Sequence, residues 1–531
     1  MNTFVGTRHL VRLALRRDRV MLPIWIALFA IMASGSAGAT KGLYSTTDEL
    51  ASAAETVNSS SALRALYGPI YDVTSIGAIS LFKLGPLGAA LVSILAILVM
   101  VRHSRTEEEA GRLELVGATV VGRHAPLAAA FIVSVGSVVV LGLVTALALA
   151  GSGLAAGGSL AFGLAWAGAG AAFAAVAGIT AQLTHSARAA TGAAMGALGV
   201  AYLVRAVADT SASTSWLSWL SPIGWFQQVR AYQTERWWAL LLPAAFALAL
   251  TALSFALVQR RDHGAGLFPD RLGRPDAAST LGHPLGLAWR LQRGVFFGWL
   301  AAFLVLGLLF GNIATNVSGF LTSDSATEMI QKLGGLETIT DAFLSTELGF
   351  VGIAAAAYAV QATLRLRSEE AALRSESVLA TGVSRLRWAW SHITVAVLGS
   401  TVLLLGSGLA AGLSYSAQTG NGADFGRVLA AAVVRLPAAW VLIGLAVAAF
   451  GLVPRWALAG WVLLVAFLVL GEFGPLFSLP QAVMDVSPFA HAPRLPGGEF
   501  SAIPIVALVA VSAVLVAAGL AGFRRRDVPV T

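Results

Sequence analysis

Cysteine is absent from the 531-residue sequence, which excludes disulfides, thiol catalysis and cysteine-based metal sites. Lysine is almost absent too, occurring only as Lys41, Lys83 and Lys332. None of them ends a G-x-x-x-x-G-K-[ST] sequence, so the chain has no P-loop, and it has no H-E-x-x-H zinc motif. The eight histidines form no cluster with metal-ligand spacing. We therefore expect no metal or cofactor in this chain and no enzymatic activity of its own.

Charged residues are also scarce, at 12% of the chain, whereas 57% of the chain is hydrophobic. Apolar runs of about 20 residues have the length of membrane spans. The net charge of +8 arises from basic residues at the ends of these runs, so it does not indicate nucleic-acid binding. We predict an all-α integral membrane protein with about twelve transmembrane helices, at residues 20–40, 76–101, 126–150, 159–183, 187–208, 239–258, 295–314, 347–366, 388–413, 428–452, 457–471 and 503–523.

The predicted spans form two sets of six in which the same features recur in the same order. A basic amphipathic segment precedes the first span, and one face of it carries Arg8, Arg12, Arg16 and Arg19. Its pattern returns without a gap inside the chain, at residues 283–303, where no signal peptide can lie. Both copies are predicted to be interfacial helices that lead into a span. We predict two six-span halves, residues 1–262 and 281–531, joined by a linker at 263–280.

The distribution of basic residues predicts the orientation in the membrane. If the spans alternate in direction, most of the 35 basic residues lie on the side of the N-terminus, which the positive-inside rule places in the cytoplasm. Six spans per half is an even number, so the halves are predicted to be parallel repeats with both termini and the linker in the cytoplasm. Usage rich in alanine and arginine is typical of a GC-rich bacterial genome, so we expect a bacterial plasma membrane.

A charged insert between the second and third spans of each half is the clearest repeat. RTEEEAGRLELVGATVVGR (residues 105–123) and RSEEAALRSESVLATGVSR (residues 367–385) are identical at more than half of their nineteen positions. We predict a short helix in each, with an i,i+4 ion pair between Glu108 and Arg112 and another between Glu370 and Arg374. The inserts are interpreted either as docking surfaces for a protein outside the membrane or as ordinary solvated helices.

The predicted ion pairs also predict what charge reversal would do. An i,i+4 pair on a helix surface contributes only about 0.2–0.5 kcal/mol. Replacing Glu108 or Glu370 by arginine is therefore predicted to leave the fold intact while disturbing any docked partner.

Polar and aromatic side chains inside the spans are candidates for a substrate pathway. Arg205 and Asp209 lie four residues apart near the outer end of the fifth span, and such a pair can equally anchor a helix end at the interface. The aromatic candidates can equally be core or lipid-facing residues. The full candidate set comprises Phe82, Lys83, Tyr202, Arg205, Asp209, Phe350 and Tyr358.

Together these features resemble the ABC-2 type exporter permeases. The resemblance rests on the surface helix, the six spans, the E-E-x-A-x-R-x-E insert between the second and third spans, and the aromatic, turn-rich stretch at residues 216–238 before the sixth span. Two such halves in one chain resemble the fused actinobacterial permeases, which include polyketide-antibiotic exporters and mycobacterial multidrug efflux permeases. The resemblance covers nearly the whole chain.

The resemblance implies that the inserts are coupling helices seated on two copies of a separately encoded P-loop ATPase, which binds ATP and Mg. It implies export of a lipophilic small molecule, such as a drug or antibiotic, in contact with membrane lipids. The implied coupling residues are Arg105, Glu107, Glu108, Arg112, Glu114, Thr119 and Arg123, with Arg367, Glu369, Glu370, Arg374, Glu376, Thr381 and Arg385. The alternative is a transporter driven by an ion gradient, or a lipid-handling membrane protein, without an ATPase partner.

Overall fold

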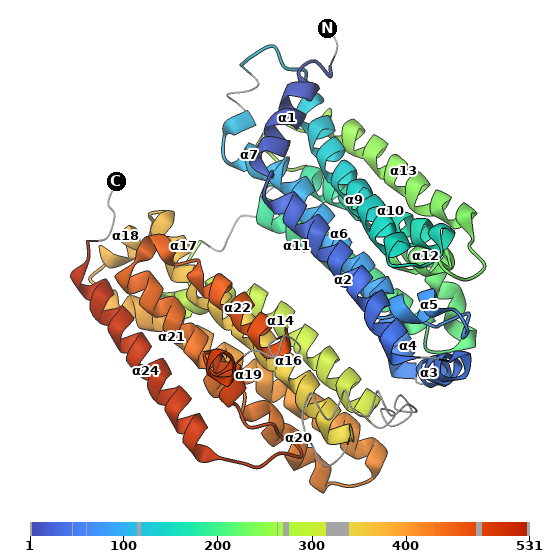
Figure 1. Cartoon of the computed structure of the whole chain (residues 1–531). Coiled ribbons are helices and arrows are strands. Elements are labelled where there is room, and N and C mark those ends of the chain that lie inside the picture. Colours follow the sequence, from blue (N-terminus) through green and yellow to red (C-terminus); the bar gives the residue numbers. More distant parts are fainter. Residues whose placement is uncertain are drawn as a thin grey trace. The chain divides into compact units, whose positions relative to one another are not determined.

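The computed structural model describes residues 3–44, 46–59, 61–113, 118–262, 264–268, 275–314, 339–473 and 480–527. Over these ranges the chain forms helices and loops without a β-strand, which confirms the prediction of an all-α protein. The helices gather into two compact units, Met1–Gly273 (blue to green in Figure 1) and Arg274–Thr531 (green to red). Each unit is described by itself.

The first unit is a bundle of long helices with short helices at both ends. Its core is formed mainly by α6 and α10, which are largely buried, and α9 packs against both. The elements are α1 (Thr7–Arg17), α2 (Met21–Leu43), α3 (Thr47–Ser59), α4 (Ser61–Tyr67), α5 (Ile76–Leu81), α6 (Gly85–Arg102), α7 (Arg105–Glu109), α9 (Ala125–Gly151), α10 (Ala156–Leu183), α11 (Ala187–Ala208), η1 (Ala212–Leu220), α12 (Pro222–Gln228), η2 (Trp237–Leu240) and α13 (Leu241–Val258).

The second unit has a similar order of long helices. Here α14 packs against α19, and α21 packs against both α16 and α24. The elements are η3 (Ser279–Gly282), α14 (Pro284–Ala314), α16 (Ile339–Thr363), α17 (Arg365–Ala371), α18 (Arg374–Leu379), α19 (Arg385–Thr419), α20 (Ala423–Val433), α21 (Leu436–Leu452), η5 (Pro454–Trp456), α22 (Ala459–Phe473), α23 (Gln481–Met484), η6 (Pro488–His491) and α24 (Ala502–Arg525).

Eleven helical segments of the described residues are long and apolar enough to cross a membrane. They correspond in order to all but one of the twelve predicted spans. The exception is the span predicted at 457–471, where α22 has 15 residues. At 1.5 Å per residue α22 is about 22 Å long, shorter than the ~30 Å hydrocarbon core of a bilayer. The chain is a multi-pass membrane protein, and its eleventh predicted span is the short one.

Paired glycines allow the long helices to pack closely. A Cβ atom on Gly142 of α9 would lie 2.2 Å from the carbonyl oxygen of Gly163 in α10, and one on Gly163 would lie 2.1 Å from that of Gly142. In the second unit a Cβ on Gly451 of α21 would lie 1.8 Å from the carbonyl oxygen of Gly519 in α24. Backbones in direct contact supply the packing that the hydrophobic effect cannot supply between helices in lipid.

The beginning of the bundle differs between the units. In the first unit the amphipathic helix α1 ends at Arg17 and is capped by Asp18, and α2 begins at Met21 after an elbow. In the second unit the repeat predicts the same elbow, but α14 continues through this point for 31 residues. Gln292 occupies the place of Asp18 in the gap-free alignment, and glutamine is the better helix former of the two.

Candidate functional site

The two inserts share a backbone turn that divides each predicted helix into two parts. α7 ends at Glu109 and is followed by Gly111 with φ 70°, whereas α17 ends at Ala371 and is followed by Leu373 with φ 57°. Gly111 and Leu373 occupy the same position of the repeat. Glycine adopts this left-handed conformation freely, but leucine does so at a cost of roughly 1–2 kcal/mol. Both copies therefore share this turn, although only the first has the residue that suits it.

The predicted ion pairs of Glu108 with Arg112 and of Glu370 with Arg374 are not formed. Glu108 instead accepts two hydrogen bonds from Arg261, at 2.5 and 2.8 Å. Glu370 accepts two from Arg526, at 2.6 and 2.9 Å. The left-handed residue reverses the chain between each glutamate and its predicted partner, so the i,i+4 geometry of a continuous helix is lost. The prediction was wrong about the partner of each glutamate.

These pairs are buried and join the inserts to the last long helix of each unit. The side chains of Glu108 and Glu370 are 6% and 1% exposed. Arg261 follows the end of α13, and Arg526 caps the end of α24. Two parallel N–H···O⁻ bonds between a guanidinium and a carboxylate form the strongest and most directional class of protein ion pair. The inserts are thus fixed to elements about 150 residues further along the chain.

A second arginine of each insert completes this attachment. Arg123 donates to the carbonyl oxygens of Val258 and Arg261, at 3.0 and 3.1 Å, and so satisfies groups at the end of α13. Arg385 donates to the carbonyl oxygen of Arg526 at 2.7 Å. We call each three-residue set the insert clamp: Glu108, Arg123 and Arg261 in the first unit, and Glu370, Arg385 and Arg526 in the second.

Glu107 and Glu369 bind the two arginines that were predicted to pair with Glu108 and Glu370. Arg112 donates to Glu107 at 2.9 Å, and Arg374 donates to Glu369 at 2.9 and 3.1 Å. The hydrogen bonds to Glu369 raise the pKa of the Arg374 guanidinium above its usual value. Both arginine side chains are more than half exposed, at 53% and 56%. Both arginines therefore lie at the surface of the inserts, where ion pairs contribute little to stability, although the side chain of Glu369 is only 8% exposed.

The first residue of the repeat has different surroundings in the two units. Arg105 is 1% exposed, lies 2.8 Å from Glu108 and donates to the carbonyl oxygens of Thr184 and Ala265. Its counterpart Arg367 is 37% exposed and lies 3.6 Å from Glu370. The insert of the first unit is thus attached to more of its own unit than the insert of the second.

The remaining predicted coupling residues are divided between the surface and the undescribed ranges. Thr119, Glu376 and Thr381 are exposed, and the hydroxyl of Thr381 donates to the carbonyl oxygen of Val378 at 2.6 Å. Glu114 lies outside the described residues. The residues that a docked protein could reach on the inserts include Arg112, Thr119, Arg374, Glu376 and Thr381.

Three of the predicted pathway residues lie together and hold a short helix in place. Arg205 is buried, donates to the carbonyl oxygen of Ala65 at 2.7 Å and lies 3.2 Å from Asp209. Its guanidinium lies 4.4 Å from the ring centroid of Tyr202, whose hydroxyl donates to the carbonyl oxygen of Leu66 at 2.6 Å. Since Ala65 and Leu66 belong to α4, this cluster fastens α4 to α11. That arrangement favours the anchoring alternative, and a pathway role stays a prediction.

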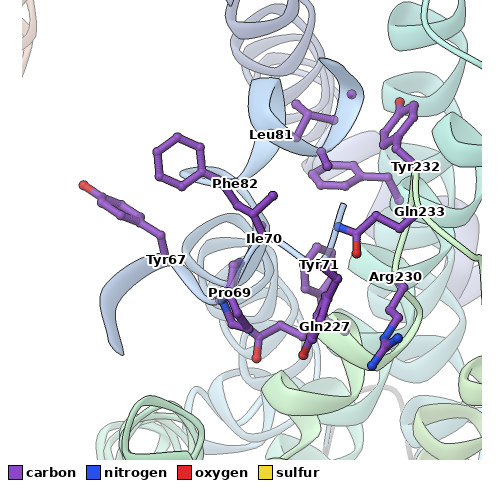
Figure 2. A pocket seen from close by; sticks show the side chains of 17 residues that line it. Tyr67, Pro69, Ile70, Tyr71, Leu81, Phe82, Gln227, Arg230, Tyr232 and Gln233 are labelled. Carbon is purple, nitrogen blue, oxygen red and sulfur yellow. The ribbon is translucent and has the colours of Figure 1, made fainter. Parts of the chain in front are cut away.

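Phe82 lines a small cavity at the end of the first unit opposite its insert (Figure 2). The cavity is about 60 Å³, which is room for roughly two water molecules and too small for a bulky compound. The buried Oε1 atoms of Gln227 and Gln233 have no hydrogen-bond partner there among the described residues. Lys83 Nζ lies 5.7 Å from the ring centroid of Phe82. The sequence did not predict this cavity, because it forms where the loops before α5 and after α12 meet the ends of several helices.

The last two pathway candidates lie in the second unit, on α16. Phe350 is 39% exposed, whereas Tyr358 is 1% exposed and packs against Phe296 and Trp299. The Tyr358 hydroxyl is buried without a hydrogen-bond partner in the part of the chain that the structure describes. Phe350 and Tyr358 therefore differ in burial, and a shared pathway role stays a prediction.

The helices and the repeated inserts define the class of the protein as a multi-pass, all-α membrane protein with two related units. The chain belongs to the family described as "Multidrug efflux system permease Rv1217c, C-terminal domain", which matches residues 8–258 and 281–524. It is also 42% identical over 528 residues to the multidrug efflux system permease protein Rv1217c of Mycobacterium tuberculosis (strain ATCC 25618 / H37Rv). That alignment covers 99% of this chain and 96% of the relative.

Proposed function

We propose that the chain is the permease subunit of an ATP-driven exporter of lipophilic compounds, including drugs or antibiotics. It lies in a bacterial plasma membrane with both termini in the cytoplasm. It binds no ATP and carries out no catalysis, and two copies of a separate P-loop ATPase supply ATP, Mg and hydrolysis. The carrying observation is the membership of an efflux permease family, together with an insert that occurs once in each unit.

The insert clamps supply a physical route from an ATPase to the membrane helices. When a docked ATPase displaces an insert, the buried pair of Glu108 with Arg261 moves the end of α13 with it. Glu370 and Arg526 do the same for α24. Two parallel hydrogen bonds fix the relative position of the two groups better than one does. A displacement of the insert is therefore passed on to the helix end. The exposed arginines, Arg112 and Arg374, remain available to the partner.

The proposal is tested by purifying the chain with and without its ATPase. We expect the chain alone to show no saturable binding of ATP, and we expect binding once a P-loop ATPase copurifies at two copies per chain. Cells that produce both proteins should accumulate less of a lipophilic antibiotic than cells with a hydrolysis-deficient ATPase. ATP binding by the chain alone, or equal accumulation in both strains across a broad drug panel, would contradict the proposal.

The orientation is tested by labelling, since the chain has no cysteine of its own. Thr119→Cys and Thr381→Cys place thiols on exposed positions of the two inserts, and Ser59→Cys places one on an exposed position of α3. A membrane-impermeant maleimide added to intact cells should label Ser59→Cys alone. Labelling of either insert from outside would reverse the proposed topology.

A further inference from the structure

The elbow between α1 and α2 combines a basic surface with an apolar groove. One hollow is lined by Arg8, Arg12, Arg16 and Arg19 with Val11 and Leu15. A second, of about 360 Å³, is lined mostly by apolar residues of α1, α2 and α9, together with Asp18, Arg19 and Ser137. Val11, Leu15 and Arg19 line both hollows, so the basic surface and the apolar groove are continuous.

The four arginines of this surface are available to an external anion. All four are exposed, and none forms an ion pair with a carboxylate among the described residues. The neighbouring Arg17 differs, because it pairs with Glu107 of the insert. Three guanidinium groups on α1 and that of Arg19 in the following turn attract an anionic headgroup, and the apolar groove beside them suits an acyl chain attached to it.

Buried ion pairs connect the elbow between α1 and α2 to the end of α6. Asp18 is fully buried between the two helices, where it lies 2.6 Å from His103 Nε2 and 3.0 Å from Arg102 Nη2. Asp18 also lines the groove, but its carboxylate is paired with residues at the end of α6 and not with the arginines of the basic surface.

We propose that this elbow is a binding site for one anionic phospholipid. The headgroup phosphate lies against the arginines of α1, and an acyl chain lies in the groove between α2 and α9, against Leu22, Ile26, Ile132 and Val140. The site belongs to the first unit, because Gly282 and Gly286 replace Arg8 and Arg12 in the repeat and α14 has no elbow.

The proposal is tested with the purified full chain in detergent that contains equal amounts of phosphatidylglycerol and phosphatidylcholine. Native mass spectrometry then measures which lipid stays bound. We expect phosphatidylglycerol to be retained in preference. Arg12→Gln combined with Arg16→Gln should weaken its binding roughly 30-fold, because each arginine near an anionic surface contributes about a factor of five. The matched control, Arg290→Gln with Arg293→Gln, removes two exposed arginines of α14 and should change nothing.

A second variant distinguishes the contribution of the lipid's acyl chain from that of its headgroup. Gly136 of α9 lines the groove, and a Cβ added to it would meet nothing within 4 Å, so Gly136→Leu places a bulky side chain in the groove. Gly192→Leu on α11, where space is also open, is its control. We expect Gly136→Leu, but not Gly192→Leu, to abolish the preference for phosphatidylglycerol. Excess glycerol phosphate should not displace the bound lipid. Binding that survives Gly136→Leu, or that glycerol phosphate abolishes, would show an unspecific charged surface or a free-phosphate site and would overturn the proposal.

Discussion

The insert clamp has the same form in both units, whereas its surroundings differ. In each unit a buried glutamate of the insert takes two hydrogen bonds from an arginine at the end of the last long helix. In the first unit the buried Arg105 adds a second guanidinium beside that glutamate, whereas the corresponding Arg367 is partly exposed. The insert clamp, which the two units share, thus attaches the insert to the last long helix of its own unit. The contacts around the clamp differ between the units.

The elbow region shows the same division between a shared position and a different chemistry. Asp18 forms buried ion pairs with Arg102 and His103. At the matching place Gln292 contacts His392 at 3.2 Å, so a neutral pair replaces a charged one. The charged version accompanies a broken helix and the neutral version a continuous one. The two units therefore share the order of their elements, but they differ in whether the first long helix is bent.

A third difference lies within the long helices. In the first unit Trp166 of the unbroken α10 packs on Gly88 and donates to the carbonyl oxygen of Gly85. In the second unit Arg435 lies at the break between α20 and α21, packs on Gly352 and donates to the carbonyl oxygen of Ser345. Pro437 at the start of α21 cannot continue the hydrogen bonding of α20, which accounts for the break.

Breaking the clamp is expected to have the largest effect. Glu370→Arg leaves Arg526 buried beside a like charge, and loss of one partner of a buried pair costs about 3–5 kcal/mol. The same holds for Glu108→Arg beside Arg261, so the prediction that charge reversal leaves the fold intact is replaced. We expect a large fall in folded protein, measured by fluorescence-detected size-exclusion chromatography after heating.

A charge swap distinguishes the two clamps and serves as the control. Glu370→Arg with Arg526→Glu should recover most of the stability, because the neighbouring Arg367 is partly exposed. Glu108→Arg with Arg261→Glu should recover less, because Arg105 remains buried beside the new arginine. Equal recovery in both units would show that the surroundings of the clamps do not matter.

The elbow pair should show the next largest effect. The Asp18 carboxylate compensates the charge of Arg102 and contacts His103. Asp18→Asn removes its negative charge, and we expect a loss of about 3 kcal/mol in stability. Gln292→Leu removes one neutral hydrogen bond to His392, with an expected loss of about 1–2 kcal/mol. Thermal midpoints of the two purified variants measure the difference. A larger loss for Gln292→Leu would contradict the assignment of a charged elbow to the first unit alone.

Substitutions in the left-handed turn should change stability less, and in opposite directions in the two units. Gly111→Leu introduces the strain that Leu373 already carries, and since a Cβ on Gly111 meets nothing within 4 Å, the cost of about 1–2 kcal/mol is conformational. Leu373→Gly relieves that strain and should leave the second unit as stable as before or slightly more so. Thermal midpoints that fall equally in both variants would show that the two turns differ in more than their residue.

The exposed arginines should affect stability least. Arg112→Gln and Arg374→Gln each remove a surface ion pair worth at most about 1 kcal/mol. Under the proposed function both should nevertheless reduce ATPase copurification, since these side chains face outward from the inserts. Arg290→Gln, on the exposed surface of α14, is the control. Unchanged copurification in the Arg112→Gln, Arg374→Gln double variant would favour the interpretation of the inserts as solvated helices.

Periodicity and composition were sufficient to predict the helices, because an apolar run long enough to cross a bilayer is rare outside membrane-spanning helices. The partners of Glu108 and Glu370 could not be predicted by local rules, since each lies more than 150 residues away along the chain. Gly111 is a recognisable signal for the turn that breaks the helix, but Leu373 is not. The recurrence of Arg260-Arg261-Asp262 as Arg525-Arg526-Asp527 was visible in the sequence, and its pairing with the inserts was the missing step.

The cavity beside Phe82 and the elbow groove were beyond prediction for a different reason. The cavity is lined by loops as well as helices, and the course of the loops is set by contacts such as that of the Ser75 hydroxyl with the carbonyl oxygen of Tyr232, at 2.6 Å. The groove exists because α1 and α2 meet at an elbow, which a repeat-based prediction places in both units. Both Asp18 and its counterpart Gln292 are buried, so it is the charge of Asp18 and its pairing with Arg102 and His103 that distinguish the unit that bends.

The insert clamp also imposes an order on biosynthesis. Glu108 leaves the ribosome 153 residues before Arg261, and Glu370 leaves 156 residues before Arg526. At roughly 5–20 residues per second, each carboxylate waits about 8–30 s for its counterion. During that time the insert must remain hydrated outside the bilayer, and it docks when the last helix of its unit has been inserted. Assembly of the nascent chain thus has two closing events, and a stop in translation before residue 261 leaves neither unit closed.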